Sequence, residues 1–180
     1  MRAIHRAYPN LTLRLDLDGG YTAQDALDVA RVLGERLEML EQPTPAEDWE
    51  ALSQVTRQSP VPVLADQSIS GPRSALELAS HHCADGFSIK IGSCGGLRCA
   101  RQMDGIARAA GLLMMVSCLI EPALLTAAGL SFALSSPGVH YADLDGFLDL
   151  TNDPTIPGFL LKEGWLIATQ VPGLGCALKF

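Results

Sequence analysis

The stretch LRLDLDGG, residues 13–20, alternates leucine with charged residues and ends in two glycines. Successive side chains of a β-strand point to opposite faces, so the leucines share one face while Arg14, Asp16 and Asp18 share the other. A segment with helical spacing follows at residues 22–37, and Thr22 can cap its start. The stretch therefore predicts a strand that buries one face, carries carboxylates on the other and leads into a helix.

The same unit of strand and helix recurs about every 25 residues. Further strands are expected at residues 37–43, 61–68, 86–92, 112–119 and 139–146, and further helices at residues 45–58, 73–82, 96–111 and 122–136. Alternating strands and helices are typical of parallel sheets joined by right-handed crossovers. The sequence thus predicts an α/β fold with six strands, followed by a tail rich in glycine and proline.

Ionisable residues recur at the predicted strand ends. Asp16, Glu41, Asp66 and Lys90 are separated by 25, 25 and 24 residues, and Asp143 ends the last strand. In a parallel barrel all C-terminal strand ends open on one face, whereas a doubly wound sheet concentrates its site at one switch point behind a glycine fingerprint. Only a weak match to such a fingerprint, GSCGGL, is present. The spacing favours part of a barrel.

The residue types at these ends predict metal-assisted proton transfer. Three carboxylates on neighbouring strands, roughly 4.8 Å apart, repel one another unless a cation such as Mg²⁺ binds them. A lysine beside a cation has a lowered pKa and can act as a base, while the metal stabilises the enediolate formed from a carboxylate substrate. We therefore expect Asp16, Glu41 and Asp66 to bind Mg²⁺ and Lys90 to be catalytic. A Schiff-base lysine is the alternative for Lys90, and a lone strand-end carboxylate is more often a solvated or capping group.

Composition narrows the class of protein further. The 180 residues carry a net charge of -7 without a basic run, which argues against nucleic acid and anionic membranes as partners. No apolar segment approaches the roughly 18 to 20 residues that span a bilayer, and the first residues do not resemble a signal peptide. The five cysteines form no Cys-x-x-Cys pair and are expected to be reduced. We expect one domain over residues 1–180 and a cytoplasmic location.

These motifs together resemble the enolase superfamily, in the branch of muconate-lactonizing enzymes and dipeptide epimerases. The matching segments, from about residue 5 to the C-terminus, are LRLDLDGGY, LEQP, VLADQS, SIKIGSCGGL, SCLIEP, DLDG and VPGLGCAL. The resemblance implies the C-terminal six βα units of a TIM-like (β/α)7β barrel. It also implies the same roles for the metal ligands Asp16, Glu41 and Asp66 and for the catalytic Lys90.

The resemblance further implies a substrate. The family activity is Mg²⁺-dependent epimerisation α to a carboxylate of an amino acid or dipeptide, as in an L-Ala-D/L-Glu epimerase. Asp143 and Asp145 of DLDG would bind the substrate ammonium group, and Glu121 and Cys118 would complete the substrate site. Three positions depart from the family pattern. They are Asp18 where Asn is usual, Gln67 where Glu is usual, and Pro122 where Ser is usual.

Family members also carry a capping domain and two earlier barrel strands, the second with a Lys-x-Lys motif, that have no counterpart here. We therefore expect an incomplete barrel with two open parallel edges, which forms a homo-oligomer or pairs with a partner chain that completes it. Two other functions stay open. One is a non-catalytic metal- or partner-binding barrel fragment, and the other is a succinylbenzoate synthase or cycloisomerase of the same branch, although DLDG favours the epimerase.

Overall fold

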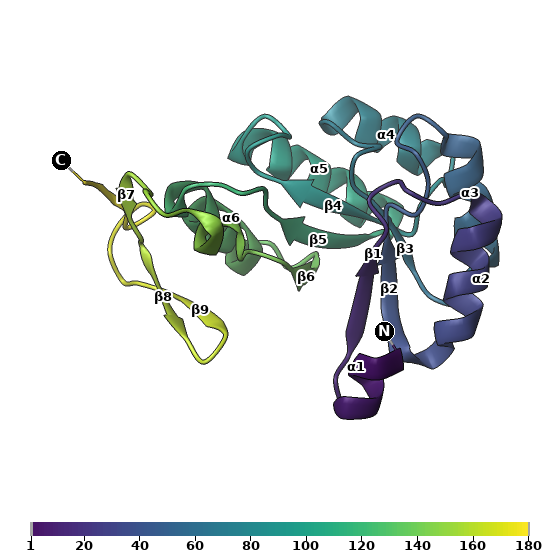
Figure 1. The fold of residues 1–180 in the computed structure, drawn as a ribbon. Coiled ribbons are helices and arrows are strands. Elements are labelled where there is room, and N and C mark those ends of the chain that lie inside the picture. Colours follow the sequence, from purple (N-terminus) through teal and green to yellow (C-terminus); the bar gives the residue numbers. More distant parts are fainter. Residues whose placement is uncertain (1, 180) are drawn as a thin grey trace.

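The computed structural model describes residues 2–179 and contains one six-stranded parallel sheet with its strands in chain order (Figure 1). The strands are β1 (Leu13–Asp16), β2 (Leu37–Glu41), β3 (Val63–Ala65), β4 (Gly86–Lys90), β5 (Leu113–Ser117) and β6 (Val139–Ala142). The sheet curls into part of a barrel, as the sequence predicted. Within the described residues, β1 pairs only with β2 and β6 pairs only with β5.

Five α-helices connect successive strands and lie on the outer side of the curled sheet (Figure 1). They are α2 (Ala23–Leu33), α3 (Trp49–Gln58), α4 (Pro72–Ser80), α5 (Leu97–Ala110) and α6 (Ala123–Ser135), and a short α1 (Arg2–Ala7) precedes β1. The side chain of Thr22 caps α2 by accepting a hydrogen bond from the Asp25 N–H group. The expected helix 22–37 ends early, because Gly34 takes a φ of 49° and a short 3-10 turn, η1 (Gly34–Arg36), leads into β2.

The apolar faces of the strands build the core beneath the helices. Leu13 and Leu17 are buried there and Leu15 packs against them, which confirms the alternation in LRLDLDGG. A separate small cluster on the inner side of the barrel contains Met39 and Met115. The inner face therefore combines a few apolar side chains with the polar groups of the strand ends.

The tail contains short elements that the sequence did not predict. These are η2 (Gly146–Asp149), β7 (Thr155–Ile156), β8 (Phe159–Lys162), β9 (Trp165–Ala168) and β10 (Ala177–Leu178). β8 and β9 form an antiparallel hairpin whose two turn residues, Glu163 and Gly164, both have positive φ, as a tight hairpin turn requires. β7 pairs with β10 in the same antiparallel manner.

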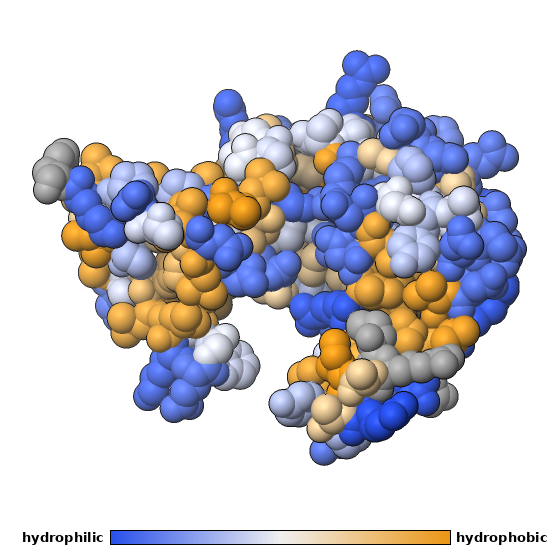
Figure 2. All heavy atoms as spheres, in the orientation of Figure 1, coloured by the Kyte–Doolittle hydropathy of each residue, from blue (hydrophilic) through white to orange (hydrophobic). Residues whose placement is uncertain are grey.

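The tail is fastened to the start of α6, where Asp153 accepts a hydrogen bond from the Ala123 N–H group at 2.7 Å, and its other side is exposed. Phe159 packs edge-on against Phe147 of η2, with ring centroids 4.9 Å apart. Leu160, Trp165 and Ile167 remain exposed, and the tail carries much apolar surface at the left of Figure 2. No α-helix within residues 2–179 has the length and apolar character needed to cross a bilayer.

Candidate active site

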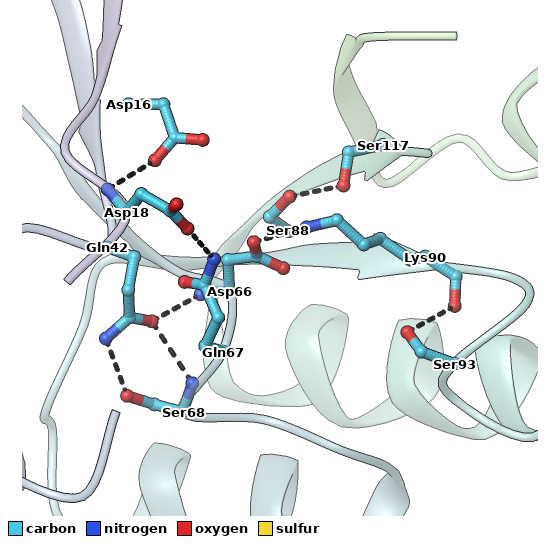
Figure 3. Close-up of polar contacts among 10 residues, drawn as sticks. All are labelled: Asp16, Asp18, Gln42, Asp66, Gln67, Ser68, Ser88, Lys90, Ser93 and Ser117. Atoms are coloured by element: carbon cyan, nitrogen blue, oxygen red, sulfur yellow. Dashed lines mark hydrogen bonds and ion pairs between the residues drawn. The ribbon is translucent and has the colours of Figure 1, made fainter. Parts of the chain in front are cut away.

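The ends of β1 to β4 bring together the four residues that the spacing singled out. Asp16 pairs with Glu41 in the register of β1 and β2, and Asp66 directly follows β3. Lys90 ends β4, and its Nζ atom forms an ion pair with Asp66 Oδ2 (Figure 3). The two side chains are only 15% and 6% exposed. The interior of the barrel therefore holds one ammonium group among several carboxylates.

Burial dominates the electrostatics of these carboxylates. It raises the pKa of Glu41 to about 7, with the charges of Asp16 and Asp66 adding to the rise, while Ser88 and Lys90 oppose it. Burial also raises the pKa of Asp66, although Lys90 donates a hydrogen bond to it. Negative charge is thus costly here, and a bound cation would relieve that cost.

A pocket of about 290 Å³ opens beside the ends of β1, β2 and β6, and its lining does not include Asp66 or Lys90. Its lining includes Asp16 and Glu41 on one side and Asp143 on the other. Carboxylate oxygens suit Mg²⁺, so the residues present fit this ion by their donor type. Within residues 2–179, no group of three or more His, Cys, Asp or Glu side chains already stands at metal-binding separations. One oxygen of Asp66 is engaged by Lys90, and Asp16 Oδ1 accepts the Asp18 N–H group at 2.9 Å.

The residues expected to bind substrate lie at the ends of β5 and β6. β6 ends at Ala142, so Asp143 and Asp145 lie in the loop beyond it and are not on one strand face. Cys118 accepts the Gly146 N–H group at 3.2 Å and donates to Asp145 Oδ1 at 3.8 Å. Glu121 is buried, and its Oε2 atom has no hydrogen-bond partner among the described residues. Only Asp143 reaches the pocket shared with Asp16 and Glu41, whereas both aspartates line a second groove of about 550 Å³ beside the tail.

Sequence reasoning missed three polar features of the barrel interior. Ser88 and Ser117 form a buried hydroxyl pair at 2.7 Å, beside Glu41 and Lys90. Arg14 spans from β1 to β6, where its guanidinium group lies 4.7 Å from the centre of the Tyr141 ring and 3.4 Å from the Ala142 carbonyl oxygen. Alternation placed Arg14 on the inner face, but no local pattern indicates its partners.

Gln42 is the third such feature. Its side-chain amide is fully buried and joins the segment after β2 to the turn after β3 (Figure 3). In the sequence, only the position of Gln42 between a strand-end carboxylate and a proline indicated that it could matter for the site.

Comparisons with known proteins agree with this geometry. Residues 1–179 match the family described as enolase C-terminal domain-like. An L-Lys-D/L-Arg epimerase from Methylococcus capsulatus is 38% identical over 97% of this chain and 50% of its own length. Muconate cycloisomerase 1 from Rhodococcus opacus is 35% identical over 93% of this chain and 45% of its own length.

A solved structure of a dipeptide epimerase from Methylococcus capsulatus, complexed with Mg and the dipeptide L-Arg-D-Lys, superimposes with a TM-score of 0.89 at 35% identity. The superposition covers 97% of this chain and 50% of that one. The chain spans about half the length of the curated relatives it matches. Its fold and its sequence agree on one conclusion, that the chain belongs to the enolase C-terminal domain-like family.

Proposed function

We propose that this chain carries the metal ligands and one acid/base residue of an epimerase that removes the proton α to the carboxylate of a dipeptide or amino-acid derivative. The observation that carries this proposal is the ion pair between Lys90 and Asp66, set among carboxylates at successive strand ends. The resemblance to dipeptide epimerases, including one that contains Mg and a dipeptide, supports it.

In this proposal each residue has a separate task. Asp16, Glu41 and Asp66 would hold Mg²⁺, which supplies positive charge that stabilises the enediolate form of the substrate carboxylate. Lys90 in its neutral form accepts the α-proton at Nζ and, as an ammonium group, returns a proton to the same face of the carbon. Asp143 and Asp145 would accept hydrogen bonds from the substrate ammonium group, and their loop would fix the distance between that group and Lys90. Glu121 and Cys118 would complete the substrate site.

The proposal includes completion of the barrel. Inversion of a stereocentre by two bases needs a second proton donor on the face opposite Lys90. We propose that a second copy or a partner chain pairs with the open edges of β1 and β6 and covers the site. The lack of a second pairing strand for β1 and β6 within the described residues supports this, because unpaired backbone groups favour strand addition. The five free cysteines fit a reducing, cytoplasmic location.

Cycloisomerisation is the second candidate, since a muconate cycloisomerase matches at 35% identity. A muconate-type substrate has no ammonium group for Asp143 and Asp145 to bind. The acidic pair therefore favours the epimerase, and substitution of either aspartate separates the two candidates.

The test is exchange of the substrate α-proton in D₂O. The chain is incubated with Mg²⁺ and either L-Ala-L-Glu or L-Arg-L-Lys, and the α-proton signal is followed by NMR. Exchange without inversion is expected if Lys90 works alone, and inversion is expected if an added partner supplies the second base. Lys90→Met should abolish exchange. Absence of exchange in the wild-type chain, combined with turnover of muconate, would instead establish the second candidate.

A further inference from the structure

The buried amide of Gln42 uses every hydrogen-bonding position that it has. Its Nε2 atom donates to the Thr44 carbonyl oxygen at 2.9 Å and to Ser68 Oγ at 2.8 Å. Its Oε1 atom accepts the N–H groups of Asp66 at 2.8 Å and of Ser68 at 3.1 Å. An amide has two donor hydrogens and two lone pairs on its oxygen, so nothing remains for a substrate or a cation. Gln42 therefore acts on its neighbours within the fold.

The backbone of Gln42 extends the same connection to β1 and β3. Its N–H group donates to the Leu64 carbonyl oxygen at 2.9 Å, and its carbonyl oxygen accepts the Gly19 N–H group at 2.7 Å. Gly19 belongs to the turn that follows Asp16. Gln42 thus contacts the turn that follows Asp16 and the segments on both sides of Asp66, and it is the chain neighbour of Glu41.

The backbone conformation of Gln42 indicates that these contacts hold it in place. Its φ of 34° lies in the left-handed region, which is unfavourable for a side chain larger than glycine. Surrounding structure must supply the energy for such a conformation. The four side-chain and two backbone hydrogen bonds supply it, and their loss would let the end of β2 relax.

We propose that Gln42 is a positioning residue that sets the separations among the carboxylates of Asp16, Glu41 and Asp66, and thereby the affinity of this site for a divalent cation. The proposal rests on the function proposed above. Side chains that orient metal ligands without touching the metal change its affinity by roughly 10- to 100-fold when they are replaced. Gln42 differs from such partners in acting on the backbone of one ligand, Asp66, and on the turns beside the other two.

Replacement of Gln42 by methionine keeps the length and burial of the side chain but removes all four of its hydrogen bonds. The N–H groups of Asp66 and Ser68 then lose their acceptor in the interior, and the turn after β3 must move to regain one. Leu78→Ala is the matched control, because Leu78 is fully buried in α4 and its truncation destabilises the core without touching the strand ends.

The experiment measures Mn²⁺ binding to the full chain by electron paramagnetic resonance and Mg²⁺ binding by calorimetry, at a temperature where circular dichroism shows both variants folded. Gln42→Met is expected to weaken binding about 10- to 100-fold, whereas Leu78→Ala retains the wild-type affinity. Equal weakening by the two variants would mean a general loss of stability and would overturn the proposal. So would unchanged binding by folded Gln42→Met.

A milder variant covers the case in which Gln42→Met does not fold. Ser68→Ala removes one acceptor of the amide and should weaken Mn²⁺ binding about 2- to 10-fold, the equivalent of one hydrogen bond. Unchanged affinity in that variant overturns the proposal. A wild-type chain that binds no Mn²⁺ overturns it together with the metal site, whereas Mn²⁺ binding without α-proton exchange overturns only the proposed function.

Discussion

The ends of β1 to β3 and the ends of β5 and β6 are held by different means. At the first three ends, backbone hydrogen bonds and the saturated amide of Gln42 fix the turns at distances near 2.9 Å. At the last two, the Asp143 N–H group also donates to the Val116 carbonyl oxygen at 2.9 Å, but Asp145 and Gly146 are tied to the end of β5 by the Cys118 sulfur, whose contacts are longer and weaker. In the proposed function, the first region would hold the metal ligands at fixed separations, and the longer contacts of the second would let its loop adjust to a substrate.

The second region depends heavily on one glycine. A Cβ atom at Gly146 would lie 1.8 Å from the Leu119 carbonyl oxygen, so Gly146→Ala forces the loop away from the end of β5. We expect a loss of about 1–3 kcal/mol or more in the free energy of unfolding, measured by urea titration. Gly105→Ala is the control, because Gly105 lies within α5 with open space around it and alanine is the better helix former. A shared urea midpoint for Gly146→Ala and the wild-type chain would show that the loop is looser than its contacts indicate.

In the first region, a double-mutant cycle can test whether the side chains of Asp18 and Gln67 interact. Gln67 Nε2 donates to Asp18 Oδ1 at 2.5 Å, so two of the three positions that depart from the family pattern contact each other. In Gln67→Glu, two carboxylates face each other beside the acidic cluster of the strand ends. In the double variant, Asp18→Asn with Gln67→Glu, an amide again faces a carboxylate. We expect Gln67→Glu to be destabilising and the double variant to recover about 1 kcal/mol of that loss, measured by urea unfolding at neutral pH. Strictly additive effects would show that the two positions are independent.

Substitutions of Cys118 are expected to lower the free energy of unfolding less than Gly146→Ala or Gln67→Glu. Cys118→Ala removes the acceptor of the Gly146 N–H group and the donor to Asp145, at a cost of about 0.5–1.5 kcal/mol in stability. Cys118→Ser keeps a donor and an acceptor and should retain much of the wild-type stability. Hydrogen exchange at the Gly146 amide is the direct measurement. Equal exchange rates in all three chains would show that the thiol does not hold this loop.

Local patterns in the sequence were sufficient for the βα units and insufficient for the tail. Alternating leucines, helix caps and glycine turns act within a few residues, so the six strands and five helices could be predicted from them. The end of α2 was placed too late, because the left-handed conformation of Gly34 has no signal beyond the glycine itself. The pairing of β7 with β10 joins segments that are distant in the sequence, and β7 and β9 pack against α6, so local patterns do not predict this arrangement.

The candidate site likewise contains some features that the sequence predicted and others that it did not. The spacing of Asp16, Glu41, Asp66 and Lys90 was sufficient to predict that they lie at neighbouring strand ends, because parallel strands align their ends. The hydrogen bonds of Gln42 and Ser88 instead join residues that lie on different strands or in the turns after them. Such partners are brought together only by the register of the sheet, so no neighbouring residue in the sequence indicates them.

The smallest expected effect is a pH dependence in the attachment of the tail to α6. Asp153 accepts hydrogen bonds from the Ala123 N–H group at the start of α6, at 2.7 Å, and from the Thr155 hydroxyl group, at 2.6 Å. Although its slight burial acts in the opposite direction, these hydrogen bonds lower the pKa of Asp153 below its ordinary value. A lowered pKa in the folded state stabilises the fold above the ordinary pKa of an aspartate, and this stabilisation is lost as the pH falls through the folded value.

The attachment of the tail to α6 should therefore weaken in acid, below about pH 4. Fluorescence of Trp165 in β9, recorded against pH with Trp49 replaced by phenylalanine, reports this change. Asp153→Asn keeps the shape of the side chain but does not ionise, so its fluorescence should lack the acid transition. A transition that persists in Asp153→Asn would assign the pH dependence to another group and would show that ionisation of Asp153 does not control the attachment of the tail to α6.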